Sequence, residues 1–159
     1  MEHDAEIEDA EGLVWADPGN VAAFPEVDGH GSALAAEAGA DAVTLINTVL
    51  AMAVDWRQQR PLLGNVVGGL SGPAIKPIAL RAVYQVSQAV SIPVVGIGGI
   101  ATVDDVLEFA VAGATAIQVG TANFFDPTCS IKILDALPAA LSAAGIEHFS
   151  NLVGTLQTN

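Results

Sequence analysis

Basic side chains are scarce in this 159-residue sequence, which has five Lys and Arg against 18 Asp and Glu and a formal net charge of −13. A chain without a basic patch cannot neutralise a run of phosphates, so we expect no nucleic acid partner. Nine of the acidic residues precede position 31, and the first basic side chain is Arg57. The sequence therefore predicts an acidic, solvated arm at 1–20 and one folded domain at 21–159.

Cysteine and long apolar runs are also nearly absent. Cys129 is the one cysteine, which excludes an internal disulfide, and His3, His30 and His148 have no metal-ligand spacing, so we expect no metal site. No run of about 18 apolar residues is present, and the acidic N-terminal segment is the reverse of a secretory signal. We expect no membrane association and a cytoplasmic localisation.

Helical and strand-like stretches alternate from about residue 31. Alanine-rich and amphipathic segments predict helices, and short β-branched apolar runs predict buried strands. A segment with four glycines and no sustained period, 49–72, predicts a long functional loop with a short strand inside. The expected order is βαβαβα with parallel strands and right-handed crossovers. In chain order, the predicted elements are a helix at 32–38, a strand at 43–46, a helix at 75–90, a strand at 94–97, a helix at 103–112, a strand at 116–119 and a helix at 130–143.

The segment 101–113 carries the clearest helix signals. Thr102 followed three residues later by Asp105 is typical of a capping box, and Gly113 is suited to end the helix. Helical spacing predicts an inward face made of Val103, Val106, Leu107, Ala110 and Val111.

The stretch "VVGIGGIATVDD" at 94–105 passes from a strand through three glycines into that helix. Gly96, Gly98 and Ala101 satisfy the dinucleotide pattern G-x-G-x-x-G/A. A Rossmann site also needs an acidic residue about 20 positions later. That region reads Gln-Val-Gly-Thr at 118–121, so we do not favour a dinucleotide site.

An internal echo indicates a different architecture. "AGADAVTLINT" at 38–48 and "AGATAIQVGTA" at 112–122 lie 74 residues apart, the length of two βα units of about 37 residues. One strand ends in Asn47 and Thr48, and the other in Gly120 and Thr121. Ligands bind beyond the carboxyl ends of parallel strands in barrels and open sheets, so these ends are candidate binding positions.

Phosphate is the ligand that such glycines suit. In (β/α)8 barrels the loops after the last two strands often hold a phosphate through backbone N–H groups, with the start of a short helix nearby. Gly98 and Gly99 would form one such loop, and Gly120 with Thr121 the other. The alternative, that these are packing glycines at tight turns, stays open.

Longer strings carry a resemblance to a known family. "RPLLGNVVGGLSGPAIKPIALRAVYQV", "IPVVGIGGIATVDDVLEFAVAGATAIQVGTANFFDP" and "KILDAL" resemble, in order and spacing, the C-terminal half of class 1B dihydroorotate dehydrogenases over about 25–145. The resemblance implies an α/β fold, the C-terminal part of a (β/α)8 TIM barrel that would be incomplete here. It also implies FMN-dependent oxidation of dihydroorotate to orotate in pyrimidine (UMP) biosynthesis, a homo-oligomer, and an electron-transfer subunit with FAD and an iron–sulfur cluster.

The resemblance also implies roles for individual residues. Asn47 and Thr48 would bind the orotate or dihydroorotate ring. The residues that would contact FMN, the last four at its phosphate, are Ile46, Gly72, Gly98, Gly99, Gly120 and Thr121.

Two departures from the family concern catalysis. The family's catalytic cysteine lies in the N-terminal half of the barrel, and Cys129, after the last strand, does not match it. Aligning Pro25 with a family proline puts Ala22 where the family has a flavin-contacting lysine. We therefore assign no catalytic residue to this chain.

Two readings of the chain's role follow. It is either the remnant of a complete enzyme, or a half-barrel that closes by pairing with a copy of itself or with a separate N-terminal half. In the second case its function would be at most to bind FMN or phosphate, or to assemble with the complementary half. A complete barrel has about 250 residues, and an open parallel sheet exposes an edge that another chain can pair with.

Overall fold

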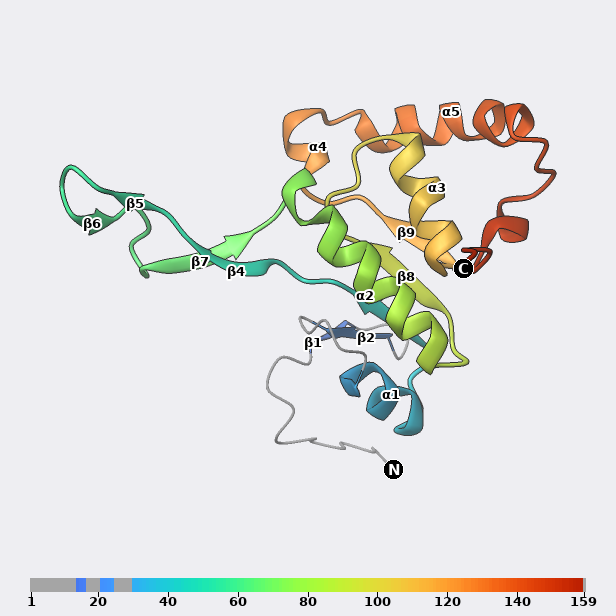
Figure 1. The fold of residues 1–159 in the computed structure, drawn as a ribbon, viewed down its shortest axis with the longest axis horizontal. Helices are drawn as coiled ribbons and strands as arrows, with labels where there is room; N and C mark the ends of the chain where they lie inside the picture. Colours follow the sequence, from blue (N-terminus) through green and yellow to red (C-terminus); the bar gives the residue numbers. More distant parts are fainter. Residues whose placement is uncertain (1–13, 17–20, 25–29, 159) are drawn as a thin grey trace.

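The computed structural model describes residues 14–16, 21–24 and 30–158, and within them a five-stranded sheet runs through the molecule (Figure 1). In spatial order its strands are β1 (Val14–Ala16), β2 (Val21–Phe24), β3 (Ala42–Leu45), β8 (Val94–Ile97) and β9 (Ala116–Gln118). β1 is antiparallel to β2, whereas β2, β3, β8 and β9 are parallel to one another. Apart from β1, the arm predicted at 1–20 lies outside the described residues, so its boundary stays a prediction.

The first three described helices connect the parallel strands, and two more follow β9. The five described helices are α1 (His30–Glu37), α2 (Lys76–Ala89), α3 (Val103–Ala112), α4 (Ala122–Phe125) and α5 (Cys129–Ala143), with short 3-10 turns at Pro73–Ile75 and Phe149–Leu152. The parallel strands follow one another in chain order, and a Rossmann sheet would instead reverse its order at a switch point. The predicted fold, part of a (β/α)8 barrel whose sheet is not closed, is confirmed.

The segment 49–72, predicted to be a long loop with a short strand inside, has more strand structure than expected. This segment forms two antiparallel hairpins, of which one pairs β4 (Val49–Met52) with β7 (Val67–Leu70) and the other pairs β5 (Val54–Asp55) with β6 (Arg60–Pro61). Together they extend away from the sheet, and we call residues 49–70 the hairpin arm (Figure 1). No buried face imposes an apolar–polar alternation on these strands, because most of their side chains are exposed, and the period that would reveal them is therefore missing.

The core lies between the sheet and helices α2 and α3. Its largest fully buried side chains are Val43, Leu45, Val83, Val86 and Phe109. The inward face expected for α3 holds at Val106 and Ala110, which are buried, while Val103, Leu107 and Val111 are half-buried.

Phe109 was not expected in the core. A Cβ at Gly96 in β8 would lie 2.6 Å from Phe109 Cδ1, so glycine in the strand provides the space for this ring. This tight packing accounts for a glycine at position 96, so Gly96 needs no nucleotide-binding role to explain its presence.

The two copies of the internal echo adopt the same local structure. Gly39 follows α1 with φ +95°, and Gly113 follows α3 with φ +122°. Each glycine then leads into a parallel strand, β3 or β9, as the repeated sequence predicts. Thr44 and Gln118, which occupy equivalent positions in the two copies, are joined by a hydrogen bond of 3.3 Å from the Thr44 hydroxyl to Gln118 Oε1.

Strand β9 forms an open edge of the sheet. Within the described residues it pairs with β8 alone, and its Ala116 and Gln118 are exposed. Beside this edge, a groove of about 370 Å³ runs between α3, β9 and α5, lined by apolar side chains that include Ile117, Ile131 and Leu134. Of the helices that the structure describes, none combines the length and the apolar character needed to cross a membrane.

Candidate functional site

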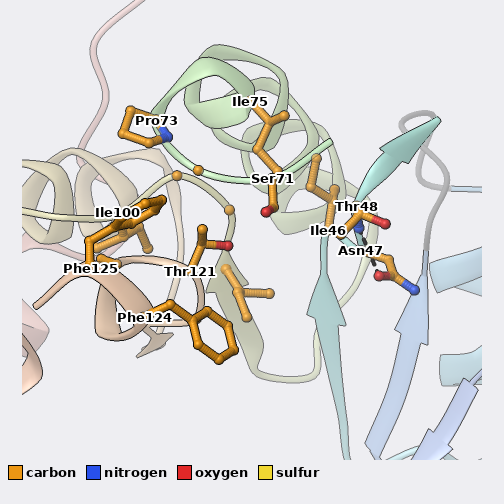
Figure 2. A pocket seen from close by; sticks show the side chains of 16 residues that line it. Ile46, Asn47, Thr48, Ser71, Pro73, Ile75, Ile100, Thr121, Phe124 and Phe125 are labelled. Atoms are coloured by element: carbon orange, nitrogen blue, oxygen red, sulfur yellow. Dashed lines mark hydrogen bonds between the residues drawn. The ribbon is translucent and has the colours of Figure 1, made fainter. Parts of the chain in front are cut away.

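A cavity of about 240 Å³ lies at the carboxyl ends of β3, β8 and β9 (Figure 2). Four segments line it, and these are 46–48 after β3, 71–75 before α2, 97–100 after β8 and 120–125 after β9. The sequence-predicted site residues all fall in this lining. They are Ile46, Asn47, Thr48, Gly72, Gly98, Gly99, Gly120 and Thr121.

The β3 side of the cavity presents two short polar side chains. Ile46 is buried, and its N–H donates to the carbonyl of Ile97 over 2.8 Å, which ties the end of β3 to the end of β8. Asn47 and Thr48 follow and are exposed, with the Thr48 N–H donating to Asn47 Oδ1 over 2.7 Å. A Cβ at Gly69 in the hairpin arm would overlap the Thr48 hydroxyl, so this glycine leaves room for the Thr48 side chain.

The turn after β8 requires glycine at both positions. Gly98 has φ +135° and Gly99 has φ +77°, conformations that residues with a Cβ rarely adopt. A Cβ at Gly99 would lie 2.8 Å from the backbone nitrogen of Lys76 and 2.9 Å from the Gly72 carbonyl oxygen. The turn therefore rests directly on the start of α2, and these glycines do have the packing role considered from the sequence.

The turn after β9 is held by a side chain that sequence reasoning missed. Asn123 donates from its backbone N–H to the Gly120 carbonyl over 3.1 Å and from Nδ2 to the Val119 carbonyl over 2.8 Å. Its Oδ1 in turn accepts a hydrogen bond of 2.9 Å from the Ser130 hydroxyl in α5. Nothing in the sequence spacing marks Asn123, because its role depends on α5 folding back over the turn.

The same two turns leave backbone donors free. The N–H groups of Gly98, Gly99, Gly120 and Thr121 donate to no acceptor among the residues that the structure describes. The cavity lining contains no Lys, Arg, Asp, Glu or His. An anion placed here would be bound by backbone N–H groups, as the sequence predicts for a phosphate.

Half of the lining was not singled out from the sequence. Ser71 and Pro73 flank Gly72 in "LSGPAI", so the turn at Gly72 was a signal that its neighbours share the cavity. Phe124 and Phe125 lie at the β9 side with 87% and 83% of their surface exposed, and Figure 2 shows Phe124 beside Thr121. The others are Ile75, Ile97, Ile100 and Ala122.

A charged pair lies beyond the second turn, outside the lining. Lys132 Nζ donates to Asp126 Oδ2 over 2.6 Å, and the Asp126 carboxylate also accepts from the Thr128 N–H and hydroxyl. These hydrogen bonds, that of Lys132 first, lower the pKa of Asp126 to about 2.

Other candidates lie away from the cavity. Cys129 is buried, its thiol is 3.5 Å from the Ala101 carbonyl, and it does not line the cavity. Ala22 is in β2 opposite Val43, whereas Pro25 lies outside the described residues. Within the described part of the chain no three His, Cys, Asp or Glu side chains are grouped so as to hold a metal ion.

Comparison with known proteins gives consistent matches. The profile of the dihydroorotate dehydrogenase family matches residues 24–141. The catalytic subunit of dihydroorotate dehydrogenase B (NAD(+)) from Geotalea uraniireducens is 57% identical over 122 residues, which are 77% of this chain and 40% of the relative. That of Halalkalibacterium halodurans is 56% identical over 117 residues, 74% of this chain and 38% of the relative.

A third relative carries a different subclass name. A Solibacter usitatus protein, named for the fumarate-type dihydroorotate dehydrogenase A, is 55% identical over 124 residues, 78% of this chain and 41% of the relative. The chain thus spans about two fifths of the length of the curated relatives it matches. The match nevertheless covers β3, β8, β9, α2, α3 and every residue of the cavity lining. On these grounds the chain belongs to the dihydroorotate dehydrogenase family.

Proposed function

We propose that this chain is the FMN-binding part of a dihydroorotate dehydrogenase that oxidises dihydroorotate to orotate in pyrimidine biosynthesis. The observation that carries the proposal is the convergence of two glycine turns, with free N–H groups, on one uncharged cavity at the ends of parallel strands. Gly98, Gly99, Gly120 and Thr121 would hold the FMN phosphate. Ile46 and Gly72 would contact the rest of the cofactor.

The residues present fit such a group. A phosphate needs several donors at close range, and bare backbone at Gly98 and Gly99 lets it approach without meeting a Cβ. Ile46, Ile97 and Ile100 also line the cavity, and their apolar side chains suit the apolar part of a flavin. A strongly basic lining is not required where backbone dipoles supply the positive end.

The chain's own side chains would bind and orient the pyrimidine. Asn47 offers an amide that can donate and accept, and Thr48 a hydroxyl, which suits the alternating N–H and C=O groups of the dihydroorotate ring. FMN, when bound, supplies the acceptor for the hydride that leaves C6. The isoleucine side chains of the lining would help to keep water from this position.

The proton that leaves C5 needs an acceptor that the cavity does not supply. Its polar side chains are Asn47, Thr48, Ser71 and Thr121, and none of these is a base near neutral pH. The matched relatives extend well beyond the aligned region, which is 40% of the Geotalea protein. We infer that the base is contributed by the part of the enzyme that corresponds to this remainder.

The relatives' names bear on partners. Those called catalytic subunit function, by that name, with another subunit, and we propose for this chain an electron-transfer subunit with FAD and an iron–sulfur cluster. The identities to the NAD(+) type and to the fumarate type, 57% and 55%, are too similar to indicate which of the two is the final electron acceptor. We also propose that this chain functions as a homo-oligomer in the cytoplasm.

The open edge of β9 favours a second candidate. A non-catalytic half-barrel that binds FMN or phosphate, or only assembles with a complementary half, would also show an unpaired strand and an adjacent apolar groove.

Flavin titration and turnover separate the two candidates. The purified chain is titrated with FMN, and orotate formation is then assayed with and without the co-expressed N-terminal part of the Geotalea relative. Flavin bound by the chain, with turnover only in the complemented sample, supports the proposal. Flavin bound without turnover in either sample favours the half-barrel, and absence of flavin binding in both contradicts both roles for the cavity.

A matched pair of variants tests the pyrimidine site. Asn47→Ala should weaken the shift that orotate causes in the spectrum of bound flavin, because it removes one or two hydrogen bonds to the ring. Asn65→Ala in the exposed hairpin arm serves as the control and should leave that shift unchanged.

A further inference from the structure

A cluster of three charged side chains lies behind the cavity, outside its lining. Lys76, the first residue of α2, donates from Nζ to Asp105 Oδ1 over 2.6 Å and lies 2.8 Å from Glu108 Oε2. Asp105 and Glu108 are in the first two turns of α3, so the cluster joins the starts of both helices. The Asp105 side chain is 11% exposed, that of Lys76 26% and that of Glu108 48%.

Asp105 links this cluster to the turn after β8. Its second oxygen, Oδ2, accepts from the N–H groups of Ala101 and Thr102, each over 2.9 Å. The Asp105 N–H is in turn 3.2 Å from the Thr102 hydroxyl, which completes the capping box predicted from the sequence. One carboxylate therefore holds the end of the glycine turn, the start of α3 and the ammonium of Lys76.

The backbone near Lys76 is in close contact with the turn. A Cβ at Gly99 would lie 2.9 Å from Lys76 Cβ and 2.8 Å from the Lys76 backbone nitrogen. A Cβ at Gly98 would lie 2.7 Å from Ala79 Cβ. The turn thus rests on the first part of α2 with no spare room. A small displacement of α2 relative to α3 would move the N–H groups of Gly98 and Gly99.

The positive charge of Lys76 is paired within the cluster. Lys76 faces two carboxylates, and its hydrogen bonds to Asp105 and Glu108 raise its pKa. Burial acts to raise the pKa of Asp105, but the hydrogen bonds from Lys76, Ala101 and Thr102 outweigh it and the pKa is lowered. Lys76 stays charged at neutral pH, and its charge is directed at α3 rather than at the cavity.

We propose that Lys76 is a positioning residue for the phosphate site: its pairing with Asp105 and Glu108 fixes the turn after β8 against the start of α2 so that the free N–H groups of Gly98 and Gly99 face one anion. Lys76 acts through this geometry and does not contact the phosphate. The inference rests on the proposed FMN function and adds to it the residue that aligns the donors.

Lys76→Met tests the proposal, because methionine keeps the apolar stem and removes the charge. Lys132→Met is the matched control, since it removes an ion pair of the same 2.6 Å length outside the cavity lining. The dissociation constants of the full chain for FMN and for riboflavin, which lacks the phosphate, are measured by flavin fluorescence. Lys76→Met should weaken FMN binding about tenfold, the loss from one misplaced charged hydrogen bond, with riboflavin unchanged. Lys132→Met should change neither.

Two further variants separate positioning from direct contact. Lys76→Arg should restore most of the FMN affinity, because a guanidinium can pair with both carboxylates. Glu108→Gln should weaken FMN binding slightly if Lys76 positions the turn. It should strengthen FMN binding if Lys76 reaches the phosphate itself, since it releases the ammonium from one carboxylate, and that result would overturn the proposal.

Amide hydrogen exchange of the ligand-free chain gives a readout that does not depend on FMN. Lys76→Met should speed exchange at 98–102 and leave β3 and β8 as in the wild type. Wild-type exchange in the variant, or equal weakening of FMN and riboflavin, contradicts the proposal. If the wild-type chain binds no FMN, the proposed function fails, and exchange still decides whether Lys76 holds the turn.

Discussion

Gly99 in the turn after β8 and Gly64 in the hairpin arm lie in opposite surroundings. At Gly99 an added Cβ would meet backbone atoms of Lys76 and Gly72, whereas at Gly64 in the arm it would meet nothing within 4 Å. The side chains beneath β8, the strand that leads into this turn, are buried, as Phe109 is, and most of those in the arm are exposed, as Trp56 is at 71%. Glycine content alone therefore does not distinguish a sterically required turn from an open one.

The largest difference in stability between the two regions is expected when an aromatic side chain is truncated in each. Phe109→Ala should lower the free energy of unfolding by about 3–5 kcal/mol, because it empties a fully buried site under β8. Trp56→Ala should cost about 1 kcal/mol or less, chiefly its contact with Arg57, whose guanidinium lies 4.6 Å from the ring centroid. Chemical denaturation measures both, and equal losses would contradict the difference in packing.

A glycine-to-alanine pair comes next in expected size. Gly99→Ala should destabilise the chain by about 2–4 kcal/mol, because it combines a strained positive φ with a backbone clash. Gly64→Ala should stay within about 0.5 kcal/mol of the wild type. Urea unfolding of the two variants is the measurement. A tolerated Gly99→Ala would show that the turn has room that the structure does not indicate.

The pH dependence of stability sharpens the contrast through Asp105. The pKa of Asp105 is lower in the folded chain than in the unfolded one, so its contribution is present above about pH 4 and is lost as the pH falls through the folded pKa. Asp105→Asn should cost about 1–2 kcal/mol at neutral pH, the value of a helix cap. Acidification should then destabilise the variant less than the wild type.

The exposed Asp104 provides the control for that measurement. Asp104→Asn removes the same charge from the first turn of α3 and should keep the wild-type loss of stability on acidification. If this variant and Asp105→Asn respond alike, the effect comes from the helix start in general and not from the contacts of Asp105.

The smallest effect on stability is expected at the arm's apolar surface. Leu50 is 73% exposed, and Leu50→Ser should change the free energy of unfolding by no more than about 0.5 kcal/mol. It should nevertheless reduce self-association in sedimentation velocity, because exposed apolar side chains such as Leu50, Trp56 and Leu62 favour contact with another chain. Unchanged association would remove the arm as a contact surface.

The sequence predicts the layered part of the fold well and the arm poorly. The strand at 94–97, the capping box of Thr102 and Asp105 and the stop at Gly113 are local signals, and the structure confirms each of them. The hairpins of the arm were missed because their residues pair with one another across positions up to about 20 apart, without a buried face to impose a period.

For the cavity, residues at strand ends could be found and those brought in by folding could not. Asn47, Thr48, Gly120 and Thr121 follow predicted strands, so the topology alone places them at one edge. Asn123 and Lys76 act through partners in α5 and α3, and no spacing along the chain announces those contacts. Their chemistry became visible only in three dimensions.

The pairing of the strands has a consequence for the order in which the sheet assembles. Val95 pairs with Ala116, 21 positions later, whereas Val43 pairs with Val94, 51 positions later with the whole arm between them. Loop-closure entropy favours the shorter connection by about 0.8 kcal/mol, so β8, α3 and β9 can nucleate before β3 joins them. Of these two pairings, the one that loses less chain entropy belongs to the unit that carries both glycine turns, and it does not require the arm to be ordered.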